Sequence, residues 1–264
     1  MEEMNQPHRP SVCIIGAGNV ATHLALALAS VAEVSQVVSR HMDSARKLGE
    51  RIGERCVASD NLGDLLPGCD FYIISVNDDA VEGVVDATPD LPGIWAHTSG
   101  SVPADVFRGK KSRYGVFYPL QTFTRDVDVN VKEVPFFIEG SDRDSEEKLV
   151  LLAGGISPVV RIADSMRRKS LHVAAVFACN FANLMWMEAD DILHGEGLDV
   201  SCFMPLLSAT LGKLRKVSPR DAMTGPARRG DTDVIRSHLE LLPPEKREIY
   251  QLLSQRILKA FSNE

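Results

Sequence analysis

Two glycines and an alanine at a fixed spacing could hold a dinucleotide. They directly follow an apolar run at residues 12–15 and open an alanine- and leucine-rich stretch. In a strand–turn–helix unit, the first glycine permits a tight turn, the second lets the backbone approach a pyrophosphate, and the small third residue lets helix and strand pack closely. The helix N-terminus then faces the phosphates. The alternative is a tight turn in a domain without a ligand. The predicted cofactor contacts are Gly16, Gly18, Asn19, Val20 and Ala21.

The residues after the second predicted strand bear on which dinucleotide fits. Folds that prefer NAD usually carry an acidic side chain about 20 residues further on, where it binds the ribose hydroxyls. Here the strand predicted at residues 34–39 ends in Ser39 and is followed by Arg40 and His41. An arginine suits a 2′-phosphate, so Ser39 and Arg40 are predicted to bind NADP, with NAD less favoured. The alternative is that Arg40 is a solvated loop residue that binds no phosphate.

Polar side chains also stand at the end of the third predicted strand, residues 71–76. Ligands of open α/β sheets bind outside the carboxyl ends of the strands. Val76 and Asn77 are therefore predicted to contact the ribose or nicotinamide part of the cofactor. Asp78 and Asp79 are more simply explained as N-caps of the next helix.

The sequence His-Thr-Ser-Gly-Ser at residues 97–101 follows the fourth predicted strand. Small hydroxyl residues beside a glycine suit a nicotinamide and substrate pocket, which makes His97 a candidate cofactor contact and Ser99 a candidate substrate contact. His97 is either a proton donor or a structural histidine at a strand end. Residues 118–123 follow the fifth strand and should line the same cleft, with Gln121 as their most useful polar group.

A strip of polar residues runs along one long helix predicted at residues 166–194. At 100° per residue, Lys169, His172, Asn180 and Asn183 fall within about 80° of one another. The surrounding residues are apolar nearly all round, which is typical of a helix buried in a domain core or a subunit interface. Because buried polar groups need partners, the strip either pairs across helices or lines a ligand site.

A compact loop at residues 224–231 carries Thr224, Arg228 and Arg229 between glycines and a proline. It could bind a carboxylate substrate, close a dimer, or only cap a helix. Thr224 is a candidate pocket residue.

The predicted elements change character near residue 164. Strands are predicted at 12–15, 34–39, 71–76, 94–97, 114–117, 135–138 and 157–162, with helices between them and Asp43 as one N-cap. Beyond residue 164 only helices are predicted, at 166–194, 201–216, 231–241 and 244–261. The fold class is therefore an α/β Rossmann-type domain with a mostly parallel sheet, residues 1–163, followed by an all-α domain, residues 164–264.

Composition narrows the classes of protein. The chain has 264 residues, 44% of them hydrophobic, and a net charge of −7. This balance disfavours nucleic acid as a partner. The odd number of cysteines and their spacing argue against zinc or disulfides and for a reducing compartment, so the cytoplasm is expected and no metal is predicted. Residues 1–10 are interpreted as a frayed tail, and no apolar run is convincingly long enough to span a membrane.

These motifs together resemble a family of two-domain bacterial proteins, labelled as NADP oxidoreductases, with a helical C-terminal domain of unknown function. The resemblance rests on the motifs at residues 16–21, 75–80, 97–101 and 118–121, on 169–181, and on 224–232. The family is similar to pyrroline-5-carboxylate reductases, ketopantoate reductases and β-hydroxyacid dehydrogenases. The resemblance implies a helical domain of the 6-phosphogluconate-dehydrogenase-like type that forms a homodimer, and an active site in the cleft between domains.

One difference from the hydroxyacid dehydrogenases limits which residue roles the resemblance implies. The hydroxyacid dehydrogenases have a helical Lys followed four residues later by Asn, whereas Lys169 is followed at that spacing by Val173. The hypothesis is an NADP(H)-dependent oxidoreductase that acts on a small carbonyl, imine or hydroxy acid. Lys169 or His172 would be the general acid, and Ser99, Asn180 and Thr224 would orient the substrate. The alternative is an NADP-binding sensor or structural protein without turnover.

Overall fold

The computed structural model describes residues 9–262 and divides into two compact units, Met1–Cys179 and Asn180–Glu264. Most of the tail interpreted as frayed, residues 1–8, lies outside the described part. The last strand ends at Ile162, and from Ser165 onward every regular element is helical. The change from strands to helices therefore falls near residue 164, whereas the two compact units divide after Cys179.

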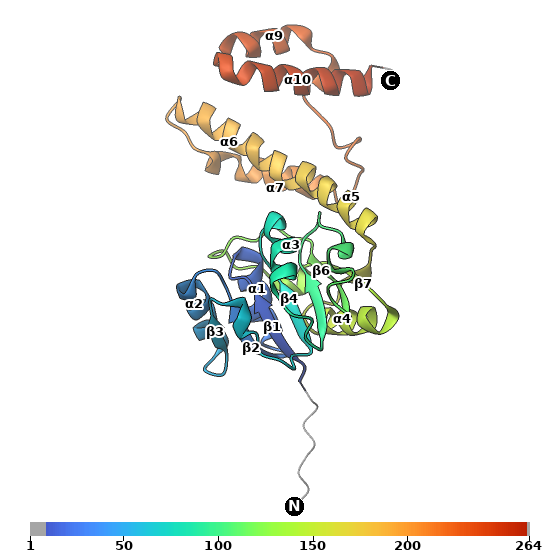
Figure 1. Cartoon of the computed structure of the whole chain (residues 1–264). Helices are drawn as coiled ribbons and strands as arrows, with labels where there is room; N and C mark the ends of the chain where they lie inside the picture. Colours follow the sequence, from blue (N-terminus) through green and yellow to red (C-terminus); the bar gives the residue numbers. More distant parts are fainter. Residues whose placement is uncertain (1–8, 263–264) are drawn as a thin grey trace, which may run out of the picture. The chain divides into compact units, whose positions relative to one another are not determined.

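The first unit is built on one eight-stranded sheet with the strand order β3-β2-β1-β4-β5-β6-β7-β8 (Figure 1). All neighbouring strands are parallel except β6 and β7, which are antiparallel. This confirms the predicted mostly parallel sheet. The strands are β1 Ser11–Ile15, β2 Glu33–Val38, β3 Val57–Ser59, β4 Phe71–Ile74, β5 Ile94–His97, β6 Tyr114–Pro119, β7 Phe136–Gly140 and β8 Val160–Ile162.

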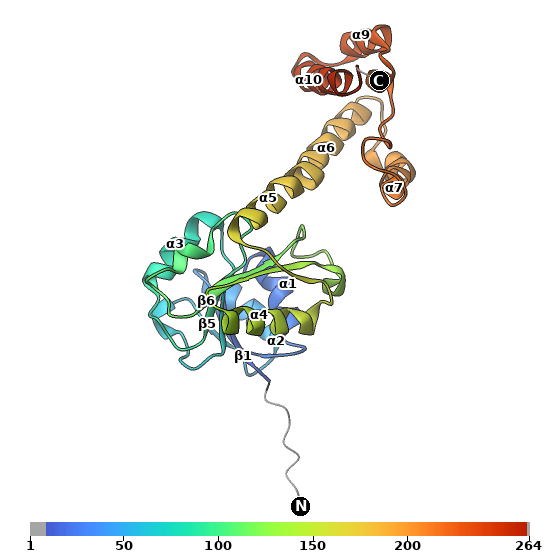
Figure 2. The ribbon, with the colours of Figure 1, turned by 90° about the vertical axis from the view of Figure 1, so that its right-hand side faces the viewer.

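Helices cover both faces of this sheet. In Figure 2, α1 (Asn19–Leu28), α2 (Met42–Ile52) and α4 (Arg143–Ile156) lie on one face, and α3 (Asp78–Ala87) lies on the other. The strands supply alternate side chains to the two cores, as their period of two requires. Val12 and Ile14 pack with the first group of helices, whereas Cys13 and Ile15 pack with α3. Burial on both faces explains the continuous apolar runs in the sequence.

The direction of the chain reverses between β1 and β4. From β1 it winds outward through β2 and β3, and it then returns to place β4, β5 and β6 on the other side. In such sheets the crevice outside the carboxyl ends of the strands, at the reversal point, is where ligands bind. The sequences that follow β1, β4, β5 and β6 all meet at this edge.

Some local expectations differ from the structure. Seven strands were expected, and the eighth, β3, has three residues, too few to show a hydrophobic pattern. The predicted N-caps at Asp43, Asp78 and Asp79 are wrong, because His41 and Asn77 are the N-caps and the three aspartates lie in the first turns. Acidic side chains in a first turn still favour a helix through its dipole.

The expected long helix is interrupted. It consists of α5 (Ser165–Ala175), a π-helical segment (Val176–Asn180) and α6 (Phe181–His194). A π turn winds more residues than an α turn, so 100° per residue does not hold between His172 and Asn180. Within residues 9–262 no residue of α6 is buried, so of the two expected alternatives, a domain core and a subunit interface, the described helices do not provide the first, and the second stays a prediction. By length and composition alone, Ser165–His194 would also pass as a membrane-spanning helix, a weak criterion.

The remaining helices are α7 Met204–Lys213, α8 Pro226–Arg229, α9 Thr232–Leu241 and α10 Pro244–Phe261. Asp231 is the N-cap residue of α9, and α10 begins with Pro244 as predicted. The helix predicted at residues 201–216 is shorter, because residues 200–203 form a 3₁₀ turn and the α-helix ends at Lys213.

Candidate functional site

The two glycines of the first turn differ in what surrounds them. Gly16 has a φ of +124°, and a Cβ on it would lie 2.0 Å from the Ser75 carbonyl oxygen. Only glycine fits there. A Cβ on Gly18 would meet no described atom within 4 Å, so open space lies in front of its backbone. Gly16 shapes the turn, and Gly18 leaves room for a ligand.

The start of α1 fits the phosphates of a dinucleotide. Gly18 is the N-cap residue and has no side chain to occupy the first amide groups of the helix, which begins at Asn19 and Val20. Such amides and the helix dipole favour an anion. Ala21 is fully buried against the strand, as the small third residue of the motif should be. The turn therefore has the shape, the amide donors and the helix N-terminus that a pyrophosphate needs.

The end of β2 stands directly beside this turn. The Gly16 amide donates a hydrogen bond to the Val38 carbonyl at 2.7 Å, and the Ser39 amide donates to Ser59 at 3.0 Å. Arg40 follows and is exposed. The predicted 2′-phosphate residues Ser39 and Arg40 thus lie at the edge that carries the glycine turn.

The residues after β4 meet the turn from its other side. The Val76 side chain lies 3.4 Å from the Cβ position of Gly16, so Val76 forms part of the wall of the turn. Asn77 is exposed at the start of α3. The Ser101 hydroxyl donates to the Asp78 carboxylate, which joins the loop after β5 to this helix.

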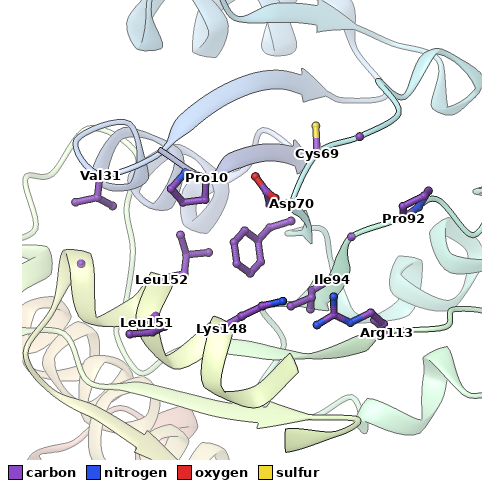
Figure 3. A pocket seen from close by; sticks show the side chains of 14 residues that line it. Pro10, Val31, Cys69, Asp70, Pro92, Ile94, Arg113, Lys148, Leu151 and Leu152 are labelled. Atoms are coloured by element: carbon purple, nitrogen blue, oxygen red, sulfur yellow. The ribbon is translucent and has the colours of Figure 1, made fainter. Parts of the chain in front are cut away.

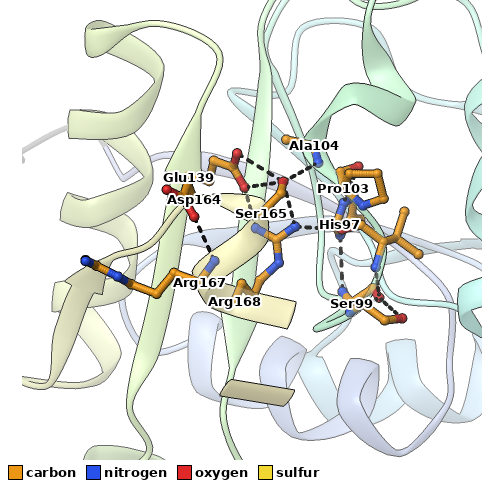
Figure 4. A network of polar contacts seen from close by, with 11 residues as sticks. His97, Ser99, Pro103, Ala104, Glu139, Asp164, Ser165, Arg167 and Arg168 are labelled. Carbon is orange, nitrogen blue, oxygen red and sulfur yellow. Dashed lines mark hydrogen bonds and ion pairs between the residues drawn. The ribbon is translucent and has the colours of Figure 1, made fainter. Parts of the chain in front are cut away.

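His97 is buried and makes hydrogen bonds within the loop after β5 (Figure 4). Its side chain is 0% exposed. The Ser99 amide donates to Nδ1 at 3.2 Å, which puts the proton on Nε2, 3.4 Å from the Pro103 carbonyl. Burial, together with the charge of Arg168, lowers the pKa of His97 to about 4. The imidazole is therefore neutral at pH 7, and both of its nitrogens lie within hydrogen-bond distance of groups in the loop after β5.

Ser99 is largely committed to its own loop. Its hydroxyl oxygen accepts hydrogen bonds from the amides of Ser101 at 3.1 Å and Val102 at 3.0 Å. The side chain is buried. Its oxygen also lies 3.4 Å from the Ser101 hydroxyl, so all the described contacts of this side chain hold the loop after β5.

Tyr118 and His172 form the clearest acid–base pair at this edge. The Tyr118 hydroxyl lies 3.2 Å from Nδ1 of His172. Gly100 packs against both rings, since a Cβ on it would be 2.6 Å from Nδ1 of His172 and 2.8 Å from Cζ of Tyr118. Burial raises the pKa of Tyr118, so the phenol keeps its proton at neutral pH. The pair can hold a proton and pass it on.

A buried ion pair fixes the helix that carries His172 (Figure 4). Arg168, one turn before His172, is 1% exposed and pairs with Glu139 at the end of β7. It also donates to the Val102 carbonyl at 2.6 Å. Ser165 joins this group by donating to Glu139 at 2.8 Å and accepting from the Ala104 amide at 3.0 Å. This network ties α5 to the loop after β5.

The other predicted site residues do not join this cluster through described contacts. Lys169 is exposed on α5, and Gln121 is exposed and accepts a hydrogen bond from the neighbouring Thr122 amide at 2.8 Å. Asn180 and Thr224 are exposed in the second unit. The contacts of Tyr118, Arg168 and Glu139 were not predicted from the sequence. An arginine four residues before His172, hence on the same helix face, was the available signal.

A separate apolar hollow lies at the opposite edge of the sheet (Figure 3). Its volume is about 700 Å³, and its lining includes residues at the starts of β4 and β5 and residues of α4. Asp70 there is held by Ser11, and Arg113 and Lys148 both pair with Asp144. The hollow contains none of the predicted site residues, so it is not the candidate active site.

Two family models match separate parts of the chain. Residues 11–94 match the family model described as NADP oxidoreductase, coenzyme F420-dependent, and residues 134–257 match a domain of unknown function, DUF2520. No match was found among curated proteins.

Solved structures give a similarity that extends over the whole fold. A "putative NADP oxidoreductase" from Bacteroides fragilis is 38% identical over 95% of this chain and 98% of its own, with a TM-score of 0.87. Two further structures share the fold. A reductive aminase from Aspergillus terreus, in complex with NADPH and ethyl-5-oxohexanoate, is 15% identical over 96% of this chain and 94% of its own, with a TM-score of 0.69. An imine reductase from Pseudomonas sp. is 16% identical over 96% of this chain and 95% of its own, with a TM-score of 0.67. The extent and identity of the Bacteroides match show that the chain belongs to the NADP-dependent oxidoreductase family of that protein.

Proposed function

We propose that this oxidoreductase uses NADPH to reduce a small carbonyl or imine compound, or oxidises a hydroxy acid in the reverse direction. The observation that carries the proposal is the Tyr118–His172 pair at the carboxyl edge of the sheet, the same edge as the glycine turn. The reductive aminase and the imine reductase share this fold, and the aminase is in complex with a keto ester.

The chemistry needs one hydride on carbon and one proton on oxygen or nitrogen. NADPH supplies the hydride when it is bound. Tyr118 donates its hydroxyl proton to the heteroatom of the substrate, and His172 returns a proton to Tyr118 through their hydrogen bond. Gly100 keeps the two rings in contact, and Arg168 fixes the helix under His172. Lys169, exposed on the same helix, is the second candidate for the proton donor.

The remaining predicted substrate contacts stay proposals. Ser99 offers a hydroxyl group, and Asn180 and Thr224 offer exposed polar groups in the second unit. Arg229 is paired with Asp231 at 2.7 Å, and Arg228 stacks on Phe261. These two arginines are thus already engaged, which favours an uncharged carbonyl or imine over a carboxylate substrate.

The test compares two substrate classes in one variant. A ketone needs a proton from the enzyme, whereas an iminium ion arrives with its proton. We expect Tyr118→Phe to slow the NADPH-dependent reduction of ketones by roughly 100-fold and that of cyclic iminium ions by less than about fivefold. Tyr114→Phe, at the other end of the same strand, is the matched control. Equal rates for Tyr118→Phe and wild type on ketones would overturn the proton-donor role, and absence of NADPH oxidation with either class would overturn the proposed substrates.

The assembly and location belong to the same proposal. The second unit exposes large apolar side chains on α6, among them Leu184, Trp186 and Met187. A second copy of this chain is the partner that best accounts for them, so a homodimer is proposed. The five cysteines are free thiols, which agrees with a cytoplasmic enzyme.

A further inference from the structure

The segment that leaves β6, residues 121–130, lies against the glycine turn and the helix that follows it. Three consecutive residues make the contact. The Phe123 ring is 5.2 Å from the ring of His23 on α1, the Thr124 carbonyl is 2.9 Å from Nε2 of His23, and Nη2 of Arg125 donates to the Ala17 carbonyl at 2.8 Å. Arg125 and Ala17 are 108 residues apart in the chain. The segment therefore forms a strap that runs over the start of α1.

Arg125 stands at the opening of the phosphate cradle. The Ala17 carbonyl belongs to the same peptide unit as the Gly18 amide, and the space where a Gly18 side chain would stand is open. Within residues 9–262 the Arg125 guanidinium donates only to this carbonyl, although an arginine has five N–H groups in a rigid fork. The others are available to a ligand.

The positive charges at the N-terminus of α1 favour the binding of an anion. The N-terminus of α1 carries a partial positive charge, and the first turn of the helix, Asn19 to Thr22, is uncharged. A guanidinium brought to a helix N-terminus adds positive charge to positive charge. An anion between the two is attracted by both and relieves their repulsion.

We propose that Arg125 binds the pyrophosphate of NADPH and that residues 121–130 close over it. Arg40 would then bind the 2′-phosphate and Arg125 the part that NADPH and NADH share. This inference rests on the NADP-dependent family of the chain and does not depend on the role proposed for Tyr118. If ketone and imine reduction failed, the cofactor contact would still be open to its own test.

The experiment measures cofactor binding without substrate, by calorimetry on the full chain. NADPH and NADH are titrated into wild type, Arg125→Gln, Arg125→Lys and Arg40→Gln. We expect Arg125→Gln to weaken both cofactors by the same factor, roughly ten- to a hundredfold, because a charge-assisted bond to phosphate is lost. Arg125→Lys keeps the charge without the fork and should recover part of the affinity. Arg40→Gln should weaken NADPH alone. Arg143→Gln, an exposed arginine on α4, is the matched control and should bind as wild type does.

A second measurement needs no variant. Binding of NADPH to the wild type should slow amide hydrogen exchange in residues 121–130. Affinities for both cofactors within twofold of wild type in Arg125→Gln would show that Arg125 is an ordinary loop anchor, and loss for NADPH alone would place it on the 2′-phosphate. Either result, or unchanged exchange in the strap, overturns the proposal.

Discussion

The two units of this chain bury their side chains to very different extents. The first has continuous cores on both faces of its sheet. Among the described residues of the second unit, only Ala227, Ile235 and Ser254 are buried. Folding is driven mainly by apolar surface leaving water, so the first unit has the means to be stable alone, whereas the second needs apolar partners beyond its own helices.

The low burial of the second unit bears on how the apolar sequence of the long helix is explained. The sequence allowed burial in a core or in a subunit interface. Leu184, Met187 and Ile192 on α6 remain 39–57% exposed, so their burial has to come from outside the helices of their own unit. An apolar pattern in a sequence therefore predicts that a surface is buried, but it does not predict whether the same chain or another one buries it. Each unit contains one tryptophan, Trp95 in the first and Trp186 in the second, so the fluorescence of each can report the unfolding of its own unit.

The largest effect is expected at the buried ion pair of the first unit. Arg168→Met removes the cation that pairs with Glu139, which keeps only the Ser165 hydroxyl among its described donors, and it removes the side-chain donor to the Val102 carbonyl. Breaking one side of a buried pair costs about 3–5 kcal/mol of unfolding free energy. Urea unfolding followed by Trp95 fluorescence, in a Trp186→Phe background, measures it.

The exposed pair of Arg143 and Glu147 on α4 provides the control for this variant. Arg143→Met should cost less than about 1 kcal/mol, because both groups are solvated. The double variant Arg168→Met, Glu139→Leu should recover much of the loss, since two apolar side chains can replace a buried pair. A cost for Arg168→Met no larger than that for Arg143→Met would show that the network does not stabilise the first unit.

The second effect follows from the neutral state of His97. Its pKa is about 4 in the fold and 6.5 in the unfolded chain, so between these values the unfolded state binds more protons. The stability is complete above pH 6.5 and falls as the pH drops toward 4. Between pH 8 and pH 5 the loss due to His97 should be about 2 kcal/mol.

The variant His97→Gln isolates this contribution, because its amide can accept from Ser99 and donate to Pro103 but does not titrate. The difference in unfolding free energy between pH 8 and pH 5 should be smaller in this variant than in wild type, measured again through Trp95. The same pH dependence in both proteins would mean that His97 is not held neutral in the fold.

The third effect is a dependence of stability on protein concentration, which is expected for the second unit and not for the first. If a second copy covers α6, tenfold dilution should lower the stability of the second unit by about 1.4 kcal/mol per dimer. Trp186 fluorescence in a Trp95→Phe variant reports this transition. The transition of the first unit, seen through Trp95, should not depend on concentration. A concentration-independent second unit, together with a monomer in sedimentation, would refute the homodimer.

Local sequence signals predicted the parts of the fold that local interactions decide. The glycine turn, the buried strands and the start of α10 at Pro244 follow from residue types within a few positions. The Tyr118–His172 pair joins residues 54 positions apart, and it depends on how α5 leaves the sheet. Nothing near either residue indicates the other. The π-helical segment at Val176–Asn180 likewise changes the angle between His172 and Asn180 in a way that a fixed angle per residue cannot predict.

The smallest change in stability is expected at Gly18, in the glycine turn of the first unit. Gly18→Ala adds a methyl group where no described atom lies within 4 Å, at an ordinary φ of −79°. The unfolding free energy should therefore stay within about 0.5 kcal/mol of wild type. NADPH affinity should nevertheless fall at least tenfold by calorimetry, because the methyl group occupies the space that the pyrophosphate needs. Gly154→Ala, at an equally open position in α4, adds the same group at a helix interior and should leave NADPH binding unchanged. If Gly18→Ala binds NADPH as tightly as wild type, the open space in front of Gly18 is not where the cofactor lies.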